Sequence, residues 1–81
     1  GEVDIIAEDK GVIVFIEVKA RGSAAFGQPF EAVDHRKQQR LRRIALLYLK
    51  EIRREVPIRF DVISMSFREG DMQINHIEAA F

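Results

Sequence analysis

The sequence predicts an α/β domain in which one long helix crosses a mixed sheet of about four strands. Two β-branched-rich apolar runs near the start and two more near the end indicate strands. Between them, apolar residues recur at three- and four-residue spacing, which indicates a helix. The 81 residues suffice for a single domain, residues 1–81, with a small core.

The first two strands form a hairpin. Residues 3–7 and 12–18 are apolar at both odd and even positions, which is typical of strands covered on both faces. Residues 8–11 are polar and include a glycine, so they predict a loop of about four residues. We therefore expect two adjacent antiparallel strands that are buried on both sides.

Charged residues interrupt this hairpin. Folding the chain back brings Asp4 opposite Phe15 or Glu17, depending on the register, while Glu17 and Lys19 share one face because alternate strand residues do. Carboxylates about 5 to 8 Å apart on neighbouring strands can share one hard divalent cation. The alternative is a salt-bridged hairpin end at the water-exposed rim of the sheet, with Lys19 paired to Asp4 or Glu17.

A loop is predicted next to these acids. Residues 20–29 are mainly small or turn-forming and show no sustained period. Arg21 is the member best placed to contact a phosphate, and the alternative for it is a solvated loop charge. Phe26 is expected to anchor the loop on the core, with stacking on a base as the alternative.

The long helix has clear limits in the sequence. Asp34 can cap a helix that begins at about His35 and runs to about Arg54, before Pro57. Gln38 lies on the apolar face near the start, either as an amide at the core edge or as a polar arm that reaches the acids. The apolar face comprises Leu41, Ile44, Ala45, Tyr48, Leu49 and Ile52.

The formal net charge of zero hides a basic segment. No acidic residue interrupts residues 36–43, and like charges without acids at i+4 cost helix stability. The partial positive charge of the helix N-terminus adds to the cluster, which indicates a phosphate-binding surface. The alternative is a solvated helix face. The basic residues are Arg36, Lys37, Arg40, Arg42 and Arg43.

The last third predicts a second hairpin. Residues 58–67 and 72–77 indicate strands, and residues 68–71 indicate the turn between them. Asp61 is expected on the solvent-exposed face of its strand. Phe81 is expected to dock against the sheet.

Composition excludes several classes of protein. Hydrophobic residues make up 47% of the chain and charged residues 32%, which argues against disorder. No apolar run approaches the roughly 20 residues that span a membrane, and no signal segment opens the chain, so we expect a cytoplasmic protein without membrane contact. The absence of cysteine excludes disulfides, and His35 and His76 lack the spacing of a zinc site. A first residue of Gly rather than Met suggests a fragment.

Taken together, the motifs resemble those of the PD-(D/E)XK nuclease superfamily. Its signature is an Asp at the end of one strand and Glu-x-Lys on the next, matched here by Asp4 and by Glu17, Val18 and Lys19. More closely, the chain is similar to the YraN-like family of endonuclease-related proteins, which is similar to archaeal Holliday-junction resolvases. The segments that carry this similarity are residues 1–7, 15–19, 26–27, 31–33, 36–38 and 76–78, with Phe81.

The resemblance implies a restriction-endonuclease-like fold. Proteins of this kind carry an N-terminal helix that has no counterpart in this chain, and with it an acidic ligand of the superfamily is missing. We expect that helix to cover the remaining face of the sheet. Its absence would leave the face exposed and favour a homodimer or strand exchange.

The resemblance also implies metal-dependent hydrolysis of phosphodiester bonds in DNA, branched DNA included. Asp4 and Glu17 would bind Mg²⁺ or Mn²⁺ together with the Val18 carbonyl. Lys19 would orient or deprotonate the attacking water, and Gln38 would position the water or the phosphate. The residues expected to hold the nucleic-acid backbone are Arg21, Arg36, Lys37, Arg40 and Arg43.

Two other functions remain open from the sequence. The chain could be a catalytically inactive nucleic-acid-binding protein of the same fold, in which the acids are structural. It could also be a small interaction module that uses its sheet face. Neutralising Asp4 and Glu17 discriminates between nuclease and binder, because acids beside a phosphate-binding surface weaken binding in a pure binder.

Overall fold

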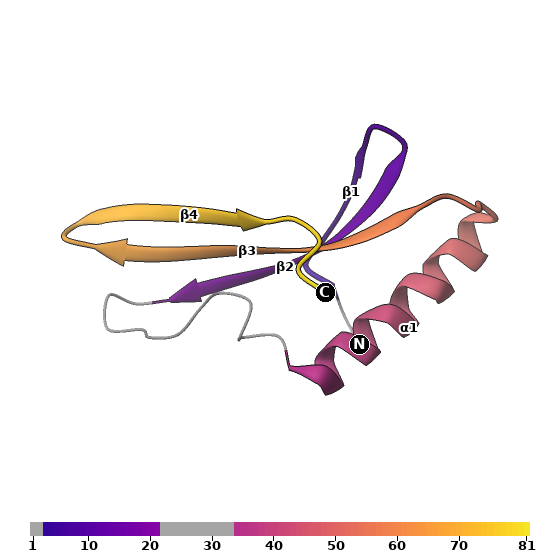
Figure 1. Cartoon of the computed structure of the whole chain (residues 1–81), viewed down its shortest axis with the longest axis horizontal. Coiled ribbons are helices and arrows are strands. Elements are labelled where there is room, and N and C mark those ends of the chain that lie inside the picture. Colours follow the sequence, from indigo (N-terminus) through magenta and orange to yellow (C-terminus); the bar gives the residue numbers. More distant parts are fainter. Residues whose placement is uncertain (1–2, 22–33) are drawn as a thin grey trace.

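The computed structural model describes residues 3–21 and 34–81. Its elements form one four-stranded sheet of order β1-β2-β3-β4 and one helix (Figure 1). The outer pairs of strands are antiparallel, and β2 and β3 are parallel. The predicted α/β fold with a mixed four-stranded sheet is confirmed. The elements are β1 (Ile5–Asp9), β2 (Val12–Arg21), α1 (His35–Ile52), β3 (Ile58–Arg68) and β4 (Asp71–Ile77).

The first hairpin turns more tightly than predicted. Lys10 and Gly11 both have positive φ, 50° and 84°, which is the conformation of a two-residue type I′ turn. The predicted loop of about four residues was wrong, because Glu8 and Asp9 belong to β1. This turn fixes a register in which Ile5 pairs with Ile16.

β1 is exposed, and its predicted burial on both faces was wrong. All five of its residues are solvent-exposed, including Ile5 at 43% and Ile6 at 37%. β1 lies at the edge of the sheet and pairs with β2 alone among the described strands. In β2, by contrast, residues 13–17 are all buried. Apolar residues at both parities therefore indicate burial for the central strand and not for the edge strand.

The core lies between α1 and one face of the sheet. Phe15 meets Tyr48 of α1 edge-on, with ring centroids 5.8 Å apart, and stacks on Phe60 of β3 at 5.7 Å. Phe81 stacks on Phe60 at 5.0 Å, so its predicted docking against the sheet is confirmed. The fully buried members of this core are Ile13, Phe15, Leu41, Ala45, Phe60 and Val62.

Both ends of α1 are capped by hydrogen bonds. The Asp34 side chain accepts a bond from the Lys37 amide at 2.8 Å, which confirms the predicted N-cap. The helix ends at Ile52, two residues before the expected limit, because Arg53 adopts the left-handed conformation with φ 56°. The Arg53 amide then bonds the carbonyls of Leu49 and Lys50. Glycine usually occupies such a cap, so an arginine at this position does not indicate the end of a helix.

Asp61 is buried, and its predicted exposure was wrong. The residue is 1% exposed although it lies on the sheet face opposite the core. Arg59 bonds it twice, from Nε at 2.9 Å and from a terminal nitrogen at 3.0 Å, and the Ala79 amide bonds it at 3.0 Å. His76 Nε2 lies 2.7 Å from its other oxygen. These groups, with the turn after β4, cover the carboxylate.

The β3–β4 hairpin carries exposed apolar side chains on that face. Phe67, Met72 and Ile74 are 51%, 53% and 58% exposed, and the register places all three on the side away from α1. Figure 1 shows the β3–β4 hairpin extending well past the helix. No helix in the described part of the chain has the length and apolarity needed to cross a membrane.

Candidate metal and nucleic-acid site

Asp4 lies next to the β2 backbone just before β1 begins. Its Oδ2 accepts a hydrogen bond from the Val18 amide at 2.9 Å. Extending the register of β1 and β2 by one residue sets Asp4 opposite Glu17, so both belong to the sheet face that α1 covers. The amide and carbonyl of a strand residue point toward the same neighbour, so the Val18 carbonyl faces the Asp4 side of β2. Asp4 thus lies beside Glu17 and the Val18 backbone, across from them on the neighbouring chain segment.

Glu17 is the buried centre of the site. Its side chain is 8% exposed, and its Oε1 lies 3.5 Å from the Lys19 ammonium. The Lys37 ammonium, from the first turn of α1, is paired with the same oxygen. The Lys19 pair is the one that the salt-bridge alternative predicts, but the carboxylate is buried and not at a water-exposed rim. A buried carboxylate requires compensation, and here two ammonium groups supply it.

The two lysines affect each other's pKa. Lys37 lowers the pKa of Lys19 through a side-chain hydrogen bond, and burial and the Lys37 charge lower it further against the opposing effect of Glu17. The hydrogen bond to Glu17 raises the pKa of Lys37. Lys19 is therefore the more readily deprotonated of the two, which suits a group that accepts a proton from water.

The residues present fit a small divalent cation. Mg²⁺ keeps several waters and needs only one or two protein carboxylates, which Asp4 and Glu17 can supply. Across residues 3–21 and 34–81, no three His, Asp or Glu side chains gather as a metal cluster. A cation held by Asp4, Glu17 and the Val18 carbonyl would therefore be mostly hydrated, unlike a structural zinc ion.

The predicted nucleic-acid contacts separate into two groups. Arg36, Arg40 and Arg43 are exposed on the outer side of α1. Lys37 instead turns toward the sheet and pairs with Glu17. Its position one helical turn before the core residue Leu41 was the feature of the sequence that could have predicted this orientation. Arg42, counted in the basic segment, lies over the rings of Phe60 and Phe81, 5.9 and 5.4 Å from their centroids.

Arg21 and Gln38 are the two remaining residues predicted for the site. Arg21 closes β2, but its side chain and the loop with Phe26 lie outside the described residues. Gln38 is half-buried one position after Lys37, and its backbone N–H donates to the Asp34 backbone carbonyl at 2.9 Å. It lies in the first turns of α1, one position after the lysine that pairs with Glu17.

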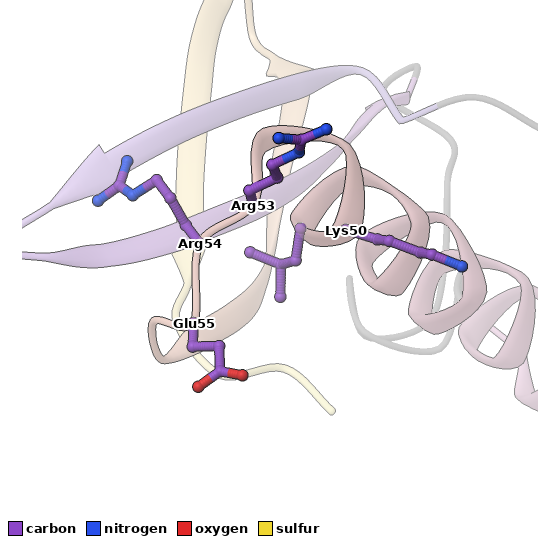
Figure 2. A pocket seen from close by; sticks show the side chains of 5 residues that line it. Lys50, Arg53, Arg54 and Glu55 are labelled. Carbon is purple, nitrogen blue, oxygen red and sulfur yellow. The ribbon is translucent and has the colours of Figure 1, made fainter.

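A pocket of about 490 Å³ lies at the other end of α1. Leu49, Lys50, Arg53, Arg54 and Glu55 line it. Figure 2 shows the labelled side chains pointing in different directions, so their charges do not converge on one point. Lys50 is thirteen residues from Lys37, roughly 20 Å along the helix axis, so this pocket is separate from the Glu17 site.

Similar proteins place the chain in a family. A model of the uncharacterised protein family UPF0102 matches residues 1–65. A UPF0102 protein of Thermodesulfovibrio yellowstonii is 49% identical over 81 residues, covering the whole chain and 69% of that relative. UPF0102 proteins of Syntrophomonas wolfei and Alkaliphilus oremlandii are 49% and 48% identical, with 71% and 72% of their lengths covered. The chain therefore belongs to the uncharacterised protein family UPF0102, the YraN-like family that its sequence resembles.

Proposed function

We propose that this protein is a metal-dependent nuclease of the PD-(D/E)XK type that hydrolyses phosphodiester bonds of DNA, branched DNA included. The observation that supports it most is the buried Glu17 carboxylate, with the Lys19 ammonium 3.5 Å away and Asp4 bonded to the adjacent Val18 amide. A structural ion pair does not need this second acid, whereas a cation site can use both carboxylates.

Each residue has a role in this chemistry. Asp4, Glu17 and the Val18 carbonyl would hold Mg²⁺ or Mn²⁺. The bound ion would acidify water and offset negative charge on the phosphate. Lys19, whose pKa is lowered, would orient the attacking water as an ammonium or, once it has lost its own proton to solvent, deprotonate that water. Gln38 orients the water or the phosphate from the first turns of α1.

The exposed arginines of α1 supply the binding surface. Arg36, Arg40 and Arg43 lie on the outer side of the helix that carries Lys37 into the site. Guanidinium groups bind phosphate oxygens and position a duplex without reading its sequence. We therefore expect structure-dependent and not sequence-dependent recognition.

A second candidate is a nucleic-acid-binding protein without catalytic activity. It is favoured by the two ammonium groups beside Glu17, which already compensate its buried negative charge. In that case Glu17→Gln would tighten DNA binding, because it removes a negative charge near the phosphates. Neither the native protein nor any variant would cleave DNA.

Cleavage assays test the proposal directly. We expect the purified protein to cut linear, flapped or four-way-branched DNA in Mg²⁺ or Mn²⁺ and to be inactive in EDTA. Inactivity on all three substrates with every divalent ion would exclude the nuclease and leave the binding protein.

The arginine surface predicts a salt dependence. Arg36→Ala and Arg40→Ala should each reduce the slope of log K against log salt by about one, since each removes one phosphate contact. Titrations of labelled DNA at several salt concentrations measure this slope. Lys50→Ala is the matched control, because it removes an exposed charge from the far end of the same helix and should leave the slope nearly unchanged. Equal changes for all three variants would mean that overall charge, and not this surface, binds DNA.

A further inference from the structure

One carboxylate oxygen of Glu17 forms ion pairs with two ammonium groups that come from different elements. Lys19 is its neighbour on β2, whereas Lys37 reaches it from the first turn of α1. The Glu17 side chain is only 8% exposed, so water cannot fully solvate its charge. Lys19 alone already supplies one positive charge for this one carboxylate, so the Lys37 ammonium is in excess of the charge that Glu17 needs.

Lys37 is fixed at its backbone and adaptable at its tip. Asp34 holds its amide at 2.8 Å, which sets the start of the helix. The side chain is 22% exposed, and its flexible four-carbon stem leaves it an outward path. Arg40 follows Lys37 by three residues, and residues at this spacing are neighbours on the helix surface. An ammonium that leaves Glu17 thus moves toward the surface proposed to hold phosphates.

We propose that Lys37 is an internal counter-ion that occupies the cation position on Glu17 and that a divalent ion must displace it. This inference rests on the proposed function, because it takes Asp4 and Glu17 as the metal ligands. With Lys37 in place, the charges of Asp4, Glu17, Lys19 and Lys37 sum to zero. A divalent ion added to that set would face two ammonium groups beside the buried Glu17 carboxylate, and these like charges repel it.

Displacement restores the balance when substrate arrives. If Lys37 leaves as the ion enters, the remaining acids, Lys19 and the ion carry one positive charge, which one phosphodiester group neutralises. The freed Lys37 ammonium can pair with that phosphate beside Arg40. Metal ion and DNA should therefore bind cooperatively, and by linkage each raises the affinity for the other equally. Without DNA, Lys37 keeps the affinity for metal low.

The affinity for Mn²⁺ alone tests this proposal without any activity measurement. Isothermal titration calorimetry compares the purified native protein with Lys37→Met. The dissociation constant for Mn²⁺ should be about tenfold lower in the variant, or lower still, because a competing positive charge is removed. In EDTA the variant should unfold at a lower temperature than the native protein, and Mn²⁺ should raise its Tm by more. Lys50→Met is the matched control: the same substitution on the same helix, far from Glu17, should leave Mn²⁺ affinity near native.

Each outcome is decisive. If the native protein binds Mn²⁺ and Lys37→Met binds it no tighter, the counter-ion proposal fails and the nuclease proposal stands. If Lys50→Met tightens binding as much, overall charge is the cause and the proposal fails. If neither native nor variant protein binds Mn²⁺, both proposals fail together. Lys37→Gln, which keeps a hydrogen-bond donor without the charge, replaces Lys37→Met if circular dichroism shows that variant unfolded, and tighter Mn²⁺ binding is again the expected result.

Discussion

Lys19→Ala is expected to lower the rate of DNA cleavage in Mn²⁺ by about 10²- to 10³-fold, the usual cost of removing one group that stabilises the transition state. Lys19 lies 3.5 Å from Glu17, and its pKa is lowered mainly by Lys37. In the proposed reaction it can therefore take a proton from water when it is neutral, and stabilise negative charge on the phosphate oxygens once it is protonated. DNA binding should change little, because the exposed arginines of α1 remain. Single-turnover cleavage and binding titrations of the same preparations separate the two effects.

Glu17→Gln should abolish cleavage as well, by removing a metal ligand. Glu8→Gln is its matched control, because Glu8 lies on the same sheet face of the same hairpin. Its carboxylate is 53% exposed and paired with Arg54 at 3.1 Å, at the opposite end of α1 from Lys37. Glu8→Gln should cut DNA at the native rate. Native cleavage by Lys19→Ala or Glu17→Gln would place the chemistry elsewhere in the protein.

The parts of the fold that the sequence predicted correctly depend on local chemistry. Asp34 caps α1 because its carboxylate reaches an amide three residues away, and that pattern is visible in the sequence. Glu17 and Lys19 share a face because alternate strand residues always do. The opposition of Asp4 and Glu17 depended on one unknown, the length of the turn, which Lys10 and Gly11 set by their positive φ.

The parts that could not be predicted depend on elements distant in sequence. The apolar composition of β1 gave no indication that it lies at the sheet edge, since the neighbours of a strand are not written in its own residues. The pairing of Lys37 with Glu17 joins residues 20 positions apart across two elements. The position of Lys37 one turn before Leu41 indicates that it faces the sheet, but the arginines around it favoured its assignment to the phosphate-binding surface.

Asp61→Asn should cause the largest loss of stability of any single substitution considered. The Asp61 side chain is fully buried and accepts hydrogen bonds from Arg59, His76 and the Ala79 amide. Removing one partner of a buried ion pair costs about 3 to 5 kcal/mol, and we expect about 3 because Arg59 is 21% exposed and regains some hydration. The turn that presents Phe81 to Phe60 should loosen with it. Urea unfolding monitored by circular dichroism measures the difference.

Asp9→Asn provides the control for the same arginine. Asp9 also pairs with Arg59, at 3.3 Å, but its side chain is 50% exposed. Exposed pairs contribute at most about 1 kcal/mol, so this variant should remain near native stability. Equal losses from the two variants would show that the Arg59 charge, and not the burial of Asp61, determines the stability.

The pH dependence of this loss follows from the pKa of Asp61. Burial alone would raise that pKa above 3.8, but the hydrogen bonds from Arg59, His76 and Ala79 outweigh it and the pKa is lowered. A carboxyl whose pKa is lower in the folded state stabilises the protein at pH values above its unfolded pKa, and this stabilisation is lost as pH falls through the folded pKa. The contribution of the Asp61 carboxylate to the stability difference between native protein and Asp61→Asn should therefore be complete above its unfolded pKa and shrink below about pH 4. A difference that stays constant into that acidic range would mean that Asp61 is not held as an ionised group by its neighbours.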